Sequence, residues 1–168
     1  MPHHEIDLSS KFESEVVRPT IESYVDGVTP NPCARCNRLV RFDLLLERAR
    51  ELGFPLIATG HYVRTAKRGG FKQLLKGVDR NKDQSYFLYG LGQEELGRAI
   101  FPVGYYDKDE IYDIAEEAEL ITADVEESQD LCFVPGGDYR EFLDREVGGQ
   151  LEEGKIVDTE GNELGHHQ

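Results

Sequence analysis

Residues 54–60, FPLIATG, form a short apolar run bounded by turn-forming residues. Such a run is typical of a strand buried on both faces of a parallel sheet. Because parallel α/β sheets bind ligands at the carboxyl ends of their strands, Gly60 and His61 are expected at a binding edge. The alternative is that His61 has no functional role and is a core or surface histidine whose ring nitrogens are hydrogen-bonded. The run predicts an α/β fold.

Residues 29–42, TPNPCARCNRLVRF, carry two cysteines in CxxC spacing. Two prolines exclude regular helix just before Cys33. From about Ala34 onward apolar residues recur at helical spacing, and Gly53 follows as a C-cap. The pattern therefore predicts that Cys33 and Cys36 stand at or just before a helix N-terminus.

Two further helical stretches are predicted. Residues 11–27 indicate a short helical piece that Pro19 interrupts. Residues 83–89 indicate a second piece, which follows a basic, glycine-containing turn. Its aromatic residues are expected in the core rather than as base-stacking platforms: Tyr86, Phe87 and Tyr89.

Capping pairs mark two later helix starts. Asp107 is followed three residues later by Glu110, and Asp138 by Glu141. After these helices the chain resembles a β-hairpin whose turn lies at residues 160–162.

The charge is distributed unevenly. A net charge of -14 argues at first against a nucleic-acid partner. The segment from Arg35 to Lys82, however, holds 12 Lys and Arg against 4 Asp and Glu. One basic segment inside an acidic molecule is the electrostatic pattern of a nucleic-acid surface, and solvated helix and loop faces are the alternative.

No apolar stretch approaches the roughly 20 residues of a membrane helix. The N-terminal residues lack the basic and apolar regions of a signal peptide. We therefore expect a cytoplasmic protein without a membrane partner.

Three cysteines leave several chemistries open. A structural zinc site normally needs four Cys or His ligands, and no second short-spaced pair accompanies the CxxC, so no metal is expected. A thioredoxin-like redox pair would follow a strand directly. A third possibility is an exchange in which Cys36, near a helix N-terminus and basic residues, resolves a reactive sulfur on Cys132. The fourth possibility is that all three cysteines are buried and unreactive.

An ordered series of motifs extends this interpretation. In chain order they are TPNPCARCNRLVRF, IATGHYVR, LLKGVDRNKDQSYFLYGL, FPVG and SQDLCFVPGGDYREFL. In this order and spacing they resemble the tRNA-specific 2-thiouridylases of the MnmA/TrmU type. The resemblance covers nearly the whole chain.

The resemblance implies a fold and a domain organisation. Residues 1–147 would form part of an adenine nucleotide alpha-hydrolase domain, Rossmann-like with a parallel sheet. A helical tRNA-binding insertion would span residues 83–120. Residues 148–168 would be the first hairpin of a small, truncated β-domain.

The resemblance also implies a reaction. ATP with Mg²⁺ would adenylate the C2 oxygen of the wobble uridine of a tRNA, and a cysteine persulfide would supply the replacing sulfur. The implied partners are tRNA and a sulfur-relay or cysteine desulfurase donor protein. Cys36 matches the nucleophile and Cys132 the persulfide carrier, and a disulfide between them would form during turnover.

Further positions match by motif. Asn31, Pro32 and Cys33 fall where the family contacts the target base. Gly60 matches an ATP contact and His61 its neighbour. The tRNA contacts that the resemblance implies are Lys82, Asp83 and Gln84. Arg35 and Arg38, the basic residues beside Cys36, are added to them.

Three departures accompany the resemblance. Cys33 stands where family members have either Asp or Cys, and Glu127-Ser128 stands where Asp-Ser is frequent. A phosphate-holding loop of the type SGGxDSS does not occur in these 168 residues. The chain is therefore expected to be an internal piece with doubtful activity alone, and a non-catalytic RNA-binding remnant or scaffold is the second hypothesis.

Overall fold

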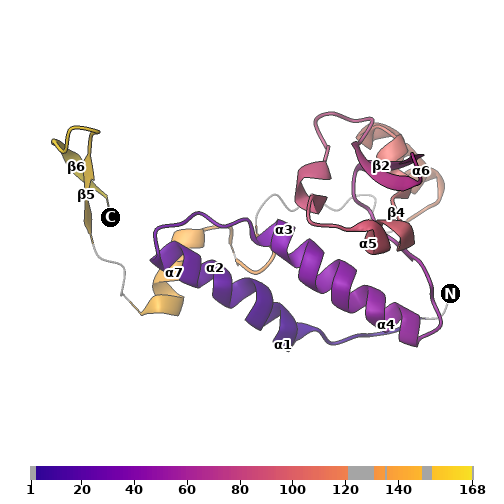
Figure 1. The fold of residues 1–168 in the computed structure, drawn as a ribbon, viewed down its shortest axis with the longest axis horizontal. Helices are drawn as coiled ribbons and strands as arrows, with labels where there is room; N and C mark the ends of the chain where they lie inside the picture. The colour runs from indigo at the N-terminus through magenta and orange to yellow at the C-terminus, as the bar shows by residue number, and fades with distance from the viewer. Residues whose placement is uncertain (1–2, 121–130, 135, 149–152, 168) are drawn as a thin grey trace. The chain divides into compact units, whose positions relative to one another are not determined.

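The computed structural model describes residues 3–120, 131–134, 136–148 and 153–167 (Figure 1). The chain divides into two compact units. The first comprises Met1–Pro19 and Asn31–Glu127, and the second comprises Thr20–Pro30 and Ser128–Gln168. Cys33 and Cys36 therefore belong to the first unit and Cys132 to the second.

The predicted strand is present and its neighbour is parallel. β1 (Ile57–Ala58) pairs in parallel with β4 (Ala99–Ile100), and the N–H of Thr59 extends the ladder to the Ile100 carbonyl at 3.0 Å. The expectation that this strand is buried on both faces is wrong, because Ala58 is exposed. Within the described residues the sheet has only these two strands, so little covers β1.

A β-hairpin follows β1, and sequence analysis predicted only its turn. β2 (Val63–Arg68) and β3 (Phe71–Lys76) are antiparallel. Gly69 and Gly70 connect them with φ of 57° and 85°, a left-handed backbone that glycine adopts without strain. The basic, glycine-containing turn is thus the tip of a hairpin.

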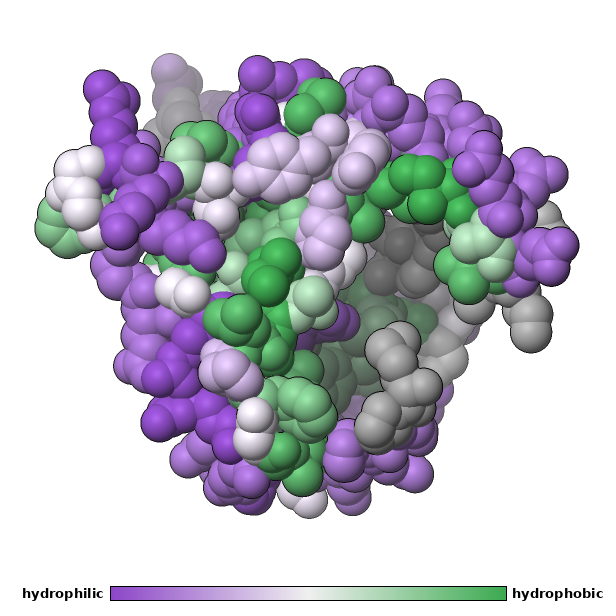
Figure 2. All heavy atoms as spheres, turned by 90° about the vertical axis from the view of Figure 1, so that its right-hand side faces the viewer, coloured by the Kyte–Doolittle hydropathy of each residue, from purple (hydrophilic) through white to green (hydrophobic). Residues whose placement is uncertain are grey.

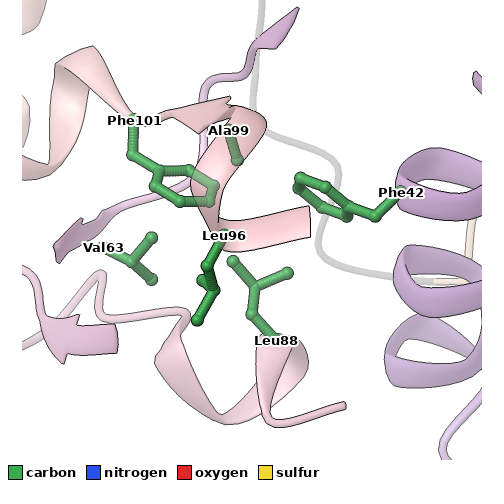
Figure 3. Packing of buried hydrophobic residues seen from close by; sticks show 6 residues of the cluster. All are labelled: Phe42, Val63, Leu88, Leu96, Ala99 and Phe101. Carbon is green, nitrogen blue, oxygen red and sulfur yellow. The ribbon is translucent and has the colours of Figure 1, made fainter. Parts of the chain in front are cut away.

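The core of the first unit joins segments that are distant in sequence. Its buried residues come from three helical segments, from β2, and from β4 with the residue that follows it (Figure 3): Phe42, Val63, Leu88, Leu96, Ala99 and Phe101. Gly104 packs directly on the backbone of Val63, where a Cβ would collide. The FPVG motif therefore needs its glycine for close packing against β2.

The first helical segment runs without a break through Pro19. It consists of α1 (Ser9–Phe12), a π-helical turn η1 (Glu13–Val17) and α2 (Arg18–Val25). The prediction that Pro19 interrupts the helix is wrong. The wider π-helical turn immediately before Pro19 changes the hydrogen-bond register at the position where a proline ring would clash with an α-helical carbonyl.

The region 83–120 is helical but not continuously so. It holds the 3₁₀ helix η3 (Ser85–Leu88), α5 (Gln93–Arg98), β4, the 3₁₀ helix η4 (Pro102–Tyr105) and α6 (Lys108–Glu117). α6 begins as predicted, with the Glu110 carboxylate accepting from the N–H of Asp107 at 2.8 Å.

The second unit holds α7 (Tyr139–Val147) and a hairpin. The Asp138 carboxylate caps α7 by accepting from the N–H of Arg140 at 2.9 Å and of Glu141 at 3.3 Å. β5 (Gly154–Val157) and β6 (Glu163–His167) are antiparallel, which confirms the predicted hairpin. The division at residue 147 stays a prediction.

Apolar side chains reach the surface in several places, as the green areas among purple ones in Figure 2 show. Among the residues that the structure describes, no helix is both long and apolar enough to cross a membrane.

Candidate functional site

The two neighbouring cysteines lie in the first turns of a long helix. It consists of α3 (Pro32–Cys36), the π-helical η2 (Asn37–Leu44) and α4 (Leu45–Glu51). The side-chain oxygen of Asn31 caps it by accepting from the N–H of Ala34 at 3.0 Å. The helix thus begins at Pro32, two residues earlier than predicted, because proline is well tolerated as the first helical residue.

Both thiols are only partly accessible. Cys33 and Cys36 are half-buried. The partial positive charge of the helix N-terminus falls off beyond the first turn, so it favours a thiolate at Cys33 more than at Cys36. η3 packs against α3, and burial together with the charge of Cys33 raises the pKa of Tyr86. Cys33 and Tyr86 are therefore electrostatic neighbours.

Arg35 is engaged within the protein. Its Nε donates to the main-chain carbonyl of Glu15, and its Nη2 lies 3.5 Å from the Glu15 carboxylate. Pro19, four residues after Glu15, has no N–H with which to occupy that carbonyl. Arg35 therefore fastens the cysteine helix to the preceding one, while Arg38 and Arg41 stand exposed on the same helix.

The predicted tRNA-contacting element is a tightly hydrogen-bonded loop. The Asp83 carboxylate accepts from the N–H of Gly77 at 2.9 Å and from the hydroxyl of Ser85 at 2.8 Å. Burial alone would raise the pKa of Asp83, but these bonds outweigh it and the pKa is lowered. The Gln84 amide oxygen accepts from the N–H of Tyr62 at 3.0 Å. Asp83 and Gln84 thus shape the loop.

Asp79 is a second organiser of this loop, and sequence analysis missed it. Its carboxylate accepts from the N–H groups of Asn81 at 2.9 Å, Lys82 at 3.3 Å and Lys108 at 3.2 Å. The first two bonds form an Asx turn, for which the spacing Asp79-x-Asn81 was an available signal. The third, to the start of α6, has no local signal.

Gly60 and His61 follow β1 at its carboxyl end, as predicted. Gly60 is exposed. His61 lies near the rings of Phe42 and Phe101, and its Nδ1 is 2.9 Å from the hydroxyl of Thr59. Burial and the charge of Arg41 lower the His61 pKa to about 4, so the imidazole is neutral at pH 7.

A cavity of about 260 Å³ lies between the cysteine helix and α5. Its walls carry both signs of charge, including Asp43, Glu94, Arg50 and Arg98. Burial first and then the charge of Glu95 raise the pKa of Asp43. None of the predicted site residues lines this cavity.

Cys132 is exposed on a turn of the second unit, in which the N–H of Val134 donates to the carbonyl of Leu131 at 2.9 Å. The pairing of Cys36 with Cys132 stays a prediction, and Glu127-Ser128 lies outside the described residues. Within the described ranges, no group of three or more His, Cys, Asp or Glu side chains could hold a metal ion.

The parallel pairing of β1 with β4 and the surrounding helices define an α/β domain of the Rossmann-like HUP class, as predicted. Residues 1–136 match the family model described as tRNA methyl transferase HUP domain, and the chain belongs to this family.

Curated relatives carry a more specific name. The chain is 48% identical over 169 residues to the tRNA-specific 2-thiouridylase MnmA of Chloroflexus aurantiacus, which covers 100% of the chain and 47% of the relative. It is 46% identical over 170 residues to MnmA 1 of Caldanaerobacter subterraneus, with coverage of 100% and 47%. It is 46% identical over 169 residues to MnmA of Geobacter metallireducens, with coverage of 100% and 46%. These findings confirm the resemblance, and the chain spans about half the length of these relatives.

Proposed function

We propose that this chain carries the thiol chemistry and part of the RNA surface of a tRNA 2-thiouridylase. The observation that carries the proposal is the placement of Cys36 in the first turns of the helix capped by Asn31, in a chain that is 48% identical to a 2-thiouridylase.

In this proposal the two cysteines have different roles. Cys132, exposed on a turn, receives a terminal sulfur from a protein persulfide donor. That sulfur attacks C2 of the uridine as the activated oxygen departs. The Cys36 thiolate then attacks the Cys132 sulfur, the sulfur on C2 leaves as the thiocarbonyl of 2-thiouridine, and a Cys36–Cys132 disulfide remains. An external thiol reductant returns both cysteines to thiols.

ATP with Mg²⁺ would supply the activation of the uridine oxygen. Gly60, exposed at the carboxyl end of β1, is the proposed ATP contact, and the neutral imidazole of His61 packs beside it. The 168 residues contain no SGGxDSS loop, so we expect weak or undetectable ATP binding by this chain alone. Calorimetric titration that found tight, Mg²⁺-dependent binding would contradict this expectation.

The proposed RNA contacts differ in how directly they can act. Asn31 is exposed beside Cys33 and is a candidate for the target base, whereas Pro32 is buried and its ring is poorly placed for contact. Asp83 and Gln84 act by shaping the loop that presents Lys82. Arg38 offers its charge to the phosphate backbone.

The test is a mass-spectrometric map of thiols after mild oxidation of the full chain. The proposal expects a Cys36–Cys132 disulfide with Cys33 left as a thiol, and expects Cys132→Ser to abolish it. A Cys33–Cys36 bridge in the native chain would contradict the proposed roles.

A second measurement separates catalysis from RNA binding. Affinity for unmodified tRNA should fall steeply as salt increases, because Lys and Arg release phosphate counterions. Salt-dependent binding without the Cys36–Cys132 linkage would favour the non-catalytic RNA-binding alternative.

A further inference from the structure

Two aromatic rings are exposed at the short helix η3, Tyr86 within the helix and Tyr89 directly after it. Tyr86 is 57% exposed and Tyr89 is 78% exposed. The expectation that these residues belong to the core is wrong for both. Tyr86 lies in η3, and Tyr89 is the C-cap residue with a backbone that is still helical (φ -59°, ψ -24°), so the three-residue repeat of this turn places the two side chains on the same side.

The opposite face of η3 is firmly anchored. Leu88 is 1% exposed and points into the core cluster, as Figure 3 shows. Asp83 and Gln84 hold the start of the helix through hydrogen bonds to Gly77 and Tyr62. The rings of Tyr86 and Phe87 lie 3.9 Å apart between centroids. The two exposed rings therefore stand on a rigid support, which keeps the entropic cost of ordering these side chains on binding low.

The exposed side of η3 lies near the helix that carries the two cysteines and near positively charged side chains. η3 contacts both α3 and η2 of the cysteine helix. The Arg38 side chain lies against Gly90, with its Cδ 3.2 Å from the position of a built Cβ. Arg41 is exposed one helical turn further along.

Aromatic faces beside cations match the requirements of an unpaired nucleic-acid base, which stacks on the ring while its phosphate meets the charge. A protein partner of opposite charge is the competing class, and RNA is favoured because each nucleotide carries a flat base for a ring together with a phosphate for Arg38. Because η3 contacts α3, which carries Cys33, a base stacked on Tyr86 would lie close to the target uridine.

We propose that Tyr86 and Tyr89 form a stacking platform for unpaired bases of the RNA substrate, next to the helix that carries Cys33 and Cys36. This inference rests on the proposed function and extends it to two residues that no motif assigned. The Tyr86 and Tyr89 rings hold the bases that flank the target uridine, and Arg38 neutralises the adjoining phosphate.

The experiment measures binding of a synthetic anticodon stem–loop to the full chain by fluorescence anisotropy. In a second probe, 2-aminopurine replaces a base next to the wobble uridine, because stacking quenches its fluorescence. The native chain should quench this probe. Tyr86→Ala and Tyr89→Ala should each weaken binding by about 5- to 150-fold and abolish the quenching, whereas Tyr86→Phe and Tyr89→Phe should retain both.

Two controls separate stacking from other effects. Phe71 is an aromatic residue of the same unit, 63% exposed and paired with Arg68 at the hairpin tip, so Phe71→Ala should leave binding and quenching unchanged. Arg38→Ala should lower the slope of log affinity against log salt by about 1, and the tyrosine variants should not change that slope.

The outcomes distinguish this inference from the proposed function. Native binding and quenching that survive Tyr86→Ala and Tyr89→Ala would overturn the stacking platform and leave the proposed function intact. Native binding without quenching would also overturn the platform, even if the alanine variants failed to fold. A native chain that bound no RNA at any salt concentration would overturn both.

Discussion

The two cysteine-bearing segments are built in opposite ways. Cys36 is half-buried in a helix that is capped by Asn31 and fastened by Arg35. Cys132 is exposed on a short turn. A thiol that must attack in one direction gains from a fixed position, whereas a thiol that must accept sulfur from another protein gains from access. The contrast fits the proposed division of labour.

Loosening the core beneath η3 should affect only one of the two segments. Leu88→Ala removes a side chain from the cluster with Phe42, and we expect a loss of about 2–5 kcal/mol of stability, measured by denaturant unfolding. Alkylation of Cys33 and Cys36 by iodoacetamide should accelerate, while that of Cys132 stays constant. Leu88→Met is the matched control and should cost less than about 1.5 kcal/mol. Equal acceleration at all three thiols would contradict the contrast.

Acidification should also act on the first unit. His61 has a folded pKa of about 4 against 6.5 as its ordinary value, so the unfolded chain binds the proton first. Its contribution to stability is therefore fully present above pH 6.5 and is lost as the pH falls toward 4, by at most about 3 kcal/mol.

The measurement for this prediction is urea unfolding at intervals from pH 7.5 to pH 4. His61→Gln should flatten the change between pH 6.5 and pH 4. A variant with the same pH dependence as the native chain would show that the carboxylates, rather than His61, dominate this window.

Removal of the helix cap should have a smaller effect. Asn31→Ala loses the bond to the N–H of Ala34, and we expect a loss of about 1 kcal/mol of stability. Asn31→Gly, which retains a tolerated N-cap, should cost only a few tenths of a kcal/mol. Asn31→Ala should also accelerate alkylation of Cys33 relative to Cys132. An unchanged ratio of the two alkylation rates would mean that the cap does not restrain the thiol.

The smallest effect on stability is expected when the contact between Arg35 and Glu15 is removed. Arg35→Ala removes both contacts with Glu15 and should cost about 0.5 kcal/mol, since both partners are substantially exposed. Glu15→Gln retains the main-chain acceptor and should cost about 0.2 kcal/mol. Equal losses, measured by thermal unfolding, would assign the contact to the carboxylate instead of the carbonyl.

Local patterns in the sequence were sufficient to predict several of the helices and strands. The caps at Asp107 and Asp138 are both made by short-range bonds, and short-range bonds are what a motif records. The parallel strand at residues 57–58 was recognised from its apolar run. Each of these features depends on residues close together in the chain.

Features decided by distant contacts were not predictable in the same way. Tyr86 and Tyr89 look like core residues by composition, but Leu88 occupies the core and turns them outward. Pro19 looks like a helix break until the π-helical turn before it is known. For the candidate site, Cys33, Cys36, Gly60 and His61 lie on the predicted elements, while the meeting of Cys36 with Cys132 remains to be measured.

The acceptor used by Arg35 is a backbone carbonyl, so the identity of residue 15 does not create it. Pro19, at the α-helical spacing from Glu15, brings no N–H that could compete for it. The two helices are therefore joined through the main chain, so a substitution at residue 15 would remove the ion pair and leave this bond in place.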